Sequence, residues 1–296
     1  VQVMKEEMNM NPLLVSVGNF GWTETGRKNF LNLRERFDCD CISLDLSPAT
    51  ARKMFRAAFI EYGSPTYYWD RAVYTYPIWM AARLSIPLVV YGENVNYEYG
   101  GKQTEETPFA YEQEDNGVAS AIPIAIWRDY DVAPENLQWM KYPPADLIYE
   151  SKVTPVYLSY YKKWSGYENM LRARKNGFKT LKDTGEWLRK GYIEQYDQID
   201  AVGYLVHCWM KWPKFGHSRA TDVASIWVRE GRLTRKEALE LVRQHDVILD
   251  PKIKDDFCKF VGWDNATFKK VVDKFYNHHL FKKVDGKWVP KEGHYV

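Results

Sequence analysis

The residues best suited to chemistry stand directly after an apolar segment, in the sequence VVYGENVNYEYGG. A carboxylate there can bind a metal ion or a substrate hydroxyl, an amide can hold a base or a sugar, and paired glycines let a ring or phosphate approach the backbone. The alternative is a solvated loop, but its position after a strand favours a site. The candidates are Tyr91, Gly92, Glu93, Asn94, Asn96, Tyr97, Glu98 and Gly100.

A second group of candidates lies in the sequence NFGWTETG. Trp22 offers an aromatic face on which a base or sugar can stack. Glu24 stands at the start of a helix, where it can contact a ligand. An acid is also favoured in a first helical turn by the helix dipole, so the structural and functional interpretations of Glu24 both stay open.

Two further segments place charged residues at the start of helices. In KFGHSRATD, a glycine turn leads into a helix, which is a good anion site, and Arg219 adds a planar donor for phosphate. Asp222 can orient this arginine or bind Mg²⁺, although an ordinary cap with a surface ion pair explains the same pattern. Asp70, after SPTYYW, is a substrate-binding candidate whose alternative is capping of the next helix.

Strands and helices alternate in the first third of the chain. Apolar runs predict strands and cap residues with helical spacing predict helices. This order predicts a parallel sheet with helices on both sides, whose ligands lie beyond the carboxyl ends of the strands. The predicted strands are 11–17, 41–46 and 87–91, and the predicted helices are 23–37, 48–62 and 70–84.

The rest of the chain is predicted to be mainly helical. Periodicity fades over residues 102–155, which we interpret as a long irregular excursion. Thr234 with Glu237 forms a capping box, and Asp285 with Gly286 predicts a hairpin turn. We therefore expect an α/β nucleotide-binding domain over residues 1–150 and a helical C-terminal region over residues 151–296.

Composition narrows the classes of function. The 296 residues carry a net charge of only +2, which argues against a nucleic-acid-binding protein. No apolar run is long enough for a membrane span, and no signal peptide is visible. The four cysteines form no C-x-x-C pair, so we expect reduced packing residues and a cytoplasmic enzyme. We assign no residue as a metal ligand.

Several long motifs resemble the N-acetyl sugar amidotransferase family, the PP-loop ATPases of surface-polysaccharide biosynthesis. They are, in order, LLVSVGNFGWTETGRKN, VVYGENVNYEYGG, GYIEQYDQIDAVGYLVH and KFGHSRATDVASIWVREGRLTRKEALELV. The resemblance implies the adenine-nucleotide α-hydrolase fold. It also implies that ATP and Mg²⁺ convert the acetamido group of a nucleotide-linked sugar to an acetamidino group, through an adenylated intermediate and ammonia from a partner glutaminase.

The resemblance also assigns roles to the candidates. Glu93, Asn94, Arg219 and Asp222 would be catalytic. The segment from Asn96 to Gly100 and Asp70 would bind substrate, while the remaining candidates would bind the nucleotide. The family's S-G-G-x-D-S loop, which grips pyrophosphate, does not occur in these 296 residues, and Gly18 stands where such enzymes commonly carry an acid.

Three alternatives remain. A PP-loop enzyme of RNA modification should bring basic patches or paired catalytic cysteines, which the chain lacks. A non-catalytic or split-enzyme subunit that binds nucleotide or sugar fits the absence of the loop. A DNA-binding winged helix would use residues 265–289, which the low net charge disfavours.

Overall fold

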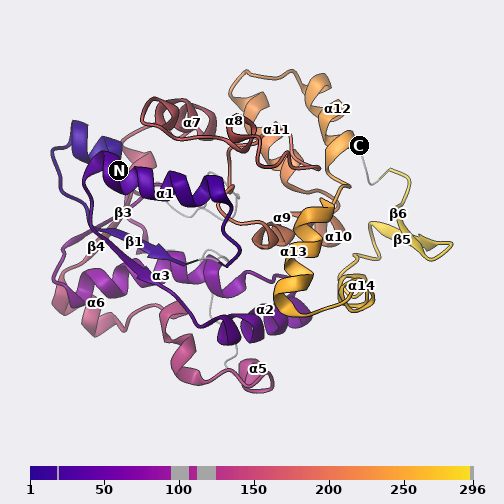
Figure 1. Ribbon diagram of the computed structural model, residues 1–296, viewed down its shortest axis with the longest axis horizontal. Coiled ribbons are helices and arrows are strands. Elements are labelled where there is room, and N and C mark those ends of the chain that lie inside the picture. The colour runs from indigo at the N-terminus through magenta and orange to yellow at the C-terminus, as the bar shows by residue number, and fades with distance from the viewer. Residues whose placement is uncertain (19, 95–106, 112–124, 294–296) are drawn as a thin grey trace. The chain divides into compact units, whose positions relative to one another are not determined.

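A computed structural model of the chain describes residues 1–18, 20–94, 107–111 and 125–293 (Figure 1). The chain packs as two compact units, each assembled from separate segments. The first unit comprises 1–19, 28–54 and 67–178, and the second comprises 20–27, 55–66 and 179–296. Each unit is described by itself. The sequence-predicted division at residue 150 falls within helix α6 (Ala145–Ser151), inside the first unit.

The described elements alternate between strands and helices up to β4 and are mainly helical after it. The first part holds η1 Val3–Glu7, β1 Leu14–Val17, α1 Glu24–Phe37, β2 Cys41–Leu44, α2 Pro48–Tyr62, α3 Tyr67–Arg83, β3 Leu88–Tyr91, α5 Ala125–Arg128, η3 Pro134–Met140, α6 Ala145–Ser151, β4 Thr154–Tyr157 and η4 Leu158–Tyr160. The second part holds α7 Gly166–Lys175, α8 Leu181–Thr184, η5 Gly203–Leu205, α9 Val206–Trp209, α10 Lys211–Phe215, α11 Arg219–Arg229, α12 Arg235–His245, α13 Pro251–Val261, α14 Asn265–Asp273, β5 Phe281–Val284 and β6 Lys287–Pro290.

Two parallel strand pairs form the sheet part of the first unit. β1 pairs with β2 in the register Leu14 to Cys41, and β3 pairs with β4 in the register Leu88 to Thr154. A parallel pair needs a crossover connection, and here α1 connects β1 to β2. Figure 1 shows α1 and α3 on opposite sides of β1. The expected mixed α/β architecture with parallel strands is confirmed, but the described strands form two separate two-stranded parallel sheets where a single sheet was expected.

The core of the first unit forms where α3 packs against β3 and β4. Its buried side chains include Tyr74, Ile78 and Ala81 from α3, with Val89 and Tyr157 from the two strands. The outer edge of β4 is covered by an antiparallel bridge from Phe109 to Val156. Burial of this apolar surface, worth roughly 25 cal/mol per Å², stabilises the unit.

The segment 102–155 differs from the expected irregular excursion. Where the structure describes it, it forms the helices α5 and α6, a 3-10 helix and the start of β4. Pro155 disguises the strand, because proline lacks the backbone donor that a ladder needs. Its neighbours still pair, since Ala110 N donates to Pro155 O at 2.9 Å and Tyr157 N donates to Pro108 O at 2.9 Å.

Aromatic rings form the core of the second unit. Phe59 packs edge-on against Phe257 at 5.3 Å between centroids and stacks on Trp263 at 5.8 Å. The predicted capping box of Thr234 and Glu237 is confirmed at the start of α12. The predicted hairpin is confirmed as β5 and β6, whose turn places Asp285 and Gly286 in left-handed backbone conformations with φ of 50° and 75°.

Among the residues that the structure describes, every helix is too short or too polar to cross a lipid bilayer.

Candidate functional site

α3 contacts residues at the ends of two strands of the first unit, β1 and β3. The side chain of Trp69, in the first turn of α3, donates from Nε1 to Gly18 O at 2.8 Å, directly after β1. α3 then leads to the start of β3, so the helix runs against that strand, and Tyr91 OH at the end of β3 donates to Tyr74 O. α3 therefore contacts the carboxyl end of β1 through Trp69 and the last residue of β3 through Tyr74, and ligands of parallel sheets bind beyond such strand ends.

Polar side chains lie at the carboxyl ends of β3 and β4. Gly92 and Glu93 are exposed immediately after β3, whereas Asn94 is buried and donates from Nδ2 to Ser159 Oγ at 3.2 Å. Because Ser159 follows β4, this hydrogen bond ties the two strand ends together. Asp70 is half-buried in the first turn of α3, next to the tryptophan that contacts the end of β1.

The structure adds a carboxylate that sequence reasoning missed. Asp45 follows β2 and packs against Gly18 so closely that a Cβ on Gly18 would collide with its carboxylate. An acid is therefore present at the end of β1, supplied by the neighbouring strand rather than by Gly18 itself. Its sequence signal was weak, since a single acid after a strand is common. The candidates Asn96, Tyr97, Glu98 and Gly100 lie outside the described residues.

In the second unit, the segment with Trp22 and Glu24 is attached to the loop that ends at Ala201. Trp22 forms an antiparallel bridge with Ala201, and Thr23 N donates to Asp200 O at 2.9 Å. Trp22 is 37% exposed. Glu24 is exposed, and its backbone N donates to Glu186 Oε1 at 3.0 Å.

Gly26 is the residue that allows this attachment. A Cβ at position 26 would collide with the backbone of Asp200, whereas one at Gly92 would meet nothing within 4 Å. We expect Gly26→Ala to lower the free energy of unfolding by roughly 1–3 kcal/mol through overpacking. We expect Gly92→Ala to leave it nearly unchanged. Urea unfolding of both variants tests this, and equal effects would contradict the packing.

Glu186 occupies the amino terminus of α1. Its carboxylate accepts hydrogen bonds from Glu24 N at 3.0 Å, Thr25 N at 2.7 Å and Thr25 Oγ1 at 2.7 Å. Burial raises the pKa of Glu186, but these hydrogen bonds and the charge of Lys252 outweigh it, so the pKa lies below its ordinary value of 4.5. The place where the helix dipole would attract an anionic ligand is thus held by the protein's own carboxylate.

The lowered pKa gives a pH-dependent contribution to stability. A depressed carboxyl pKa stabilises the fold above the unfolded pKa, and this contribution is lost as the pH falls below 4.5 toward the folded pKa. We expect the wild type to be more stable than Glu186→Gln near neutral pH, with the difference shrinking on acidification. Melting temperatures of both proteins across that range measure it. A difference that does not depend on pH would contradict the ionised cap.

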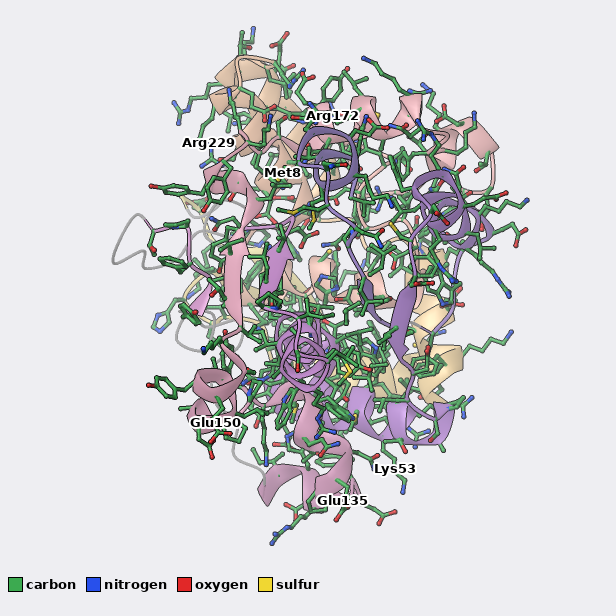
Figure 2. The ribbon with its side chains drawn as sticks, turned by 90° about the vertical axis from the view of Figure 1, so that its left-hand side faces the viewer. Met8, Lys53, Glu135, Glu150, Arg172 and Arg229 are labelled. Atoms are coloured by element: carbon green, nitrogen blue, oxygen red, sulfur yellow. The ribbon has the colours of Figure 1, made fainter. Side chains whose placement is uncertain are left out.

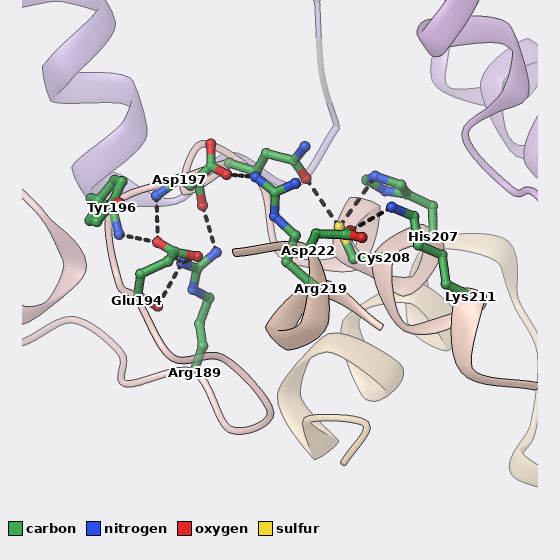
Figure 3. Close-up of polar contacts among 10 residues, drawn as sticks. Arg189, Glu194, Tyr196, Asp197, His207, Cys208, Lys211, Arg219 and Asp222 are labelled. Carbon is green, nitrogen blue, oxygen red and sulfur yellow. Dashed lines mark hydrogen bonds and ion pairs between the residues drawn. The ribbon is translucent and has the colours of Figure 1, made fainter. Parts of the chain in front are cut away.

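The amino terminus of α11 carries the other two charged candidates (Figure 3). Arg219 is buried and forms an ion pair with Asp197, whose side chain is 34% exposed. Asp222 forms an ion pair with Lys211 at 2.6 Å, and His217 Nδ1 lies 3.9 Å from its other oxygen. The structure therefore places Arg219 and Asp222 on one helix turn, each with an internal partner of opposite charge.

A buried carboxylate also caps α11. Asp246 is fully buried, accepts from Ser218 Oγ at 2.9 Å and from Thr221 N at 3.0 Å, and accepts a further bond from the Thr221 hydroxyl. This satisfies the backbone group that a bound phosphate would otherwise contact. The role of Arg219 and Asp222 toward phosphate or substrate stays a prediction.

The loop that carries Asp197 turns sharply at the next residue. Gln198 adopts a left-handed backbone with φ of 47°, which is unusual for a residue with a side chain. Its Oε1 lies 3.1 Å from Cys208 Sγ, and His207 Nε2 lies 3.3 Å from the same sulfur. The Cys208 thiol donates to Gln198 Oε1, and His207 Nδ1 donates to Tyr204 O at 2.7 Å.

A buried ion pair fixes the start of this loop. Arg189 Nη2 lies 2.9 Å and 3.0 Å from the two carboxylate oxygens of Glu194, and both side chains are shielded from solvent. Glu194 also accepts from the backbone of Tyr196 and Asp197 at 2.8 Å each, and Arg189 donates to Asp197 O at 2.7 Å. Figure 3 shows this pair beside the Asp197–Arg219 pair. The network thus positions Asp197, and through it Arg219.

Within the part of the chain that the structure describes, no three or more His, Cys, Asp or Glu side chains are grouped to hold a metal ion.

Comparison with known proteins gives one informative match. No curated protein matches the chain. Residues 190–292, within the second unit, match the family model described as LPS biosynthesis protein WbpG-like, C-terminal domain. The matched range begins one residue after Arg189 and includes Glu194, Arg219 and Asp246. Over these residues the chain is similar to the C-terminal domain of LPS biosynthesis proteins.

Proposed function

We propose that this chain is an ATP-dependent amidotransferase of surface-polysaccharide biosynthesis. In the proposed reaction, the amide oxygen of a nucleotide-linked N-acetyl sugar attacks the α-phosphate of ATP and pyrophosphate leaves. Ammonia then adds to the activated carbon, and AMP departs with the former amide oxygen. The acetamido group becomes an acetamidino group, and a separate glutaminase supplies the ammonia.

The match of residues 190–292 to the LPS biosynthesis model carries this proposal. Two structural features support it. Glu93 and Asn94 follow β3 in one parallel strand pair, and Asp70 lies beside the end of β1 in the other, at strand ends where nucleotides and sugars bind in such sheets. In the second unit, Arg219 forms an ion pair with the half-exposed Asp197. A phosphate, as a stronger anion, could replace Asp197 as the partner of this arginine.

The chain's own residues would mainly orient the substrate. Glu93 is an exposed hydrogen-bond acceptor that suits a sugar hydroxyl or the acetamido N–H. Asn94 holds the ends of β3 and β4 together, so it would position its neighbour rather than react. Trp22 offers the flat surface on which the adenine of ATP would stack. Mg²⁺ would enter with the ATP phosphates, as is usual for this ion.

The test is product formation from UDP-N-acetylglucosamine, used as a probe, with ATP, Mg²⁺ and ammonium chloride. Mass spectrometry should find a product in which NH has replaced O, formed together with AMP. We expect Glu93→Gln and Arg219→Ala to lower the rate about a hundredfold, the usual cost of removing one group that stabilises the transition state.

Glu150→Gln is the matched control, because this exposed acid lies on α6, before β4 rather than after it. We expect it to react at the wild-type rate. Rates that are equal in Glu93→Gln and Glu150→Gln would refute the site. No amidino product from any nucleotide-linked N-acetyl sugar would refute the function.

A further inference from the structure

Two exposed tyrosines stand beyond the carboxyl end of β4 in the first unit, outside every candidate identified so far. Tyr160 and Tyr161 lie three and four residues after the end of β4 and are 52% and 56% exposed. Aromatic rings usually bury 150–250 Å², so leaving two adjacent rings in water sacrifices burial energy. Such an arrangement indicates a contact surface rather than a core.

The two rings pack edge to face and together form an aromatic corner. Their centroids are 5.5 Å apart and their planes meet at 74°, so one ring presents its edge to the other. The backbone below them is a short 3-10 turn, in which Tyr161 N donates to Leu158 O at 3.0 Å and Lys162 N donates to the same oxygen at 2.9 Å. A ring entering this corner meets an aromatic face without any need to order a loop first.

This corner is joined to Asn94 and lies near Glu93, two residues that the sequence predicted to be catalytic. Ser159, which accepts from Asn94, directly precedes Tyr160. Tyr91 and Tyr157 are register partners, so the residues after them leave the sheet side by side. The exposed acceptor Glu93 therefore lies at the same end of the β3–β4 pair as the rings of Tyr160 and Tyr161. Stacking faces next to carboxylate and amide groups are the combination that recognises a sugar, since a pyranose has one apolar face and hydroxyls around it.

A cation follows the rings. Lys163 is exposed, and no ion pair of this side chain occurs among the described residues. Its neighbour Lys162 is paired with Glu7. A free ammonium beside the aromatic corner suits the diphosphate to which a nucleotide-linked sugar is attached.

We propose that Tyr160 and Tyr161 form the stacking surface for the pyranose ring of the nucleotide-linked N-acetyl sugar. This inference rests on the proposed function and names the subsite that would hold its sugar. The rings bind and orient the sugar by contact with its C–H face, and they take no part in proton transfer.

Tyr149 provides the matched control. It is the most exposed large side chain described, at 85%, but it lies on α6, before β4. Figure 2 shows the neighbouring Glu150 and Arg172, on α7 after β4, at opposite ends of the β3–β4 pair. Removal of an exposed tyrosine ring before β4 can thus be compared with removal of the two rings after β4.

The experiment measures binding of UDP-N-acetylglucosamine and of UDP alone by isothermal titration calorimetry. We expect the variant Y160A/Y161A to bind the nucleotide sugar at least about tenfold more weakly than wild type, as stacking energies imply. Y160F/Y161F, which keeps both rings, and Y149A should bind like wild type. Affinity for UDP alone should be the same in all four proteins.

Three other outcomes of this experiment would overturn the subsite, its assignment to the sugar, or the proposed function. Undiminished binding of the nucleotide sugar by Y160A/Y161A overturns the subsite while leaving the proposed function standing. An equal loss of affinity for UDP alone shows that the rings hold the nucleotide, which overturns the assignment to the sugar. If the wild type binds neither this probe nor other nucleotide-linked N-acetyl sugars, the proposed function fails and the subsite fails with it.

Discussion

Arg189→Met is expected to lower the free energy of unfolding by about 3–5 kcal/mol, because it leaves the Glu194 carboxylate buried without its counter-charge. Both side chains are shielded from water, and Arg189 also stacks on Tyr192 with 4.2 Å between the guanidinium carbon and the ring centroid. Methionine keeps most of the aliphatic stem, so the loss reports the guanidinium, with its charge and its hydrogen bonds to Asp197 O and Glu194 O. Urea unfolding followed by circular dichroism measures it.

Two further variants make this prediction specific. Lys283→Met breaks a solvent-exposed ion pair with Asp273, and we expect a change below about 1 kcal/mol. The double variant of Arg189→Met with Glu194→Gln removes the stranded charge, so it should recover part of the loss. If Arg189→Met cost no more than Lys283→Met, the buried pair would not be a main support of the loop that carries Asp197.

Asp246→Ala is expected to have the second largest effect, a loss of about 3 kcal/mol in the free energy of unfolding. The buried carboxylate accepts from Ser218 and Thr221, so its removal deletes a helix cap and strands donors that have no access to water. Because Arg219 begins the helix that this cap supports, the variant should also weaken the Arg219–Asp197 contact.

Hydrogen exchange distinguishes this local effect from general destabilisation. We expect amides in the first turn of α11 to exchange faster in Asp246→Ala than in wild type. The measurement is made without denaturant, at a pH where the protein remains folded. Asp246→Asn keeps an acceptor oxygen and should fall between wild type and Asp246→Ala. Unchanged protection in the first turn of α11 would contradict the assigned cap.

Local sequence signals predicted several strands and helix caps, but they did not predict the strand β4. The strands before Gly18 and Gly92 were predictable, because β-branched runs ended by turn residues have few other interpretations. The capping box at Thr234 was predictable for the same reason, since both partners lie within one helical turn. β4 was not, because Pro155 removes a ladder donor and masks the pattern of the strand.

Site residues that directly follow a strand could be predicted from the sequence. Residues that are brought to the site by contacts between distant parts of the chain could not. Glu186 caps α1 from 162 residues away, and Asp246 caps α11 from 25 residues away. Neither pairing leaves a local signature, so the sequence favoured bound anions where the fold places its own carboxylates. Asp45 beside Gly18 depends in the same way on strand pairing, which a single strand does not encode.

The central claim is that the acetamido oxygen of a nucleotide-linked sugar is removed as part of AMP. The most direct test supplies the sugar with that oxygen replaced by its heavy isotope, together with ATP, Mg²⁺ and ammonium. The account predicts that AMP carries the heavy isotope and that the sugar product has lost it. Amidino product formed with unlabelled AMP, or ATP consumed while the sugar retains its labelled oxygen, would contradict the account.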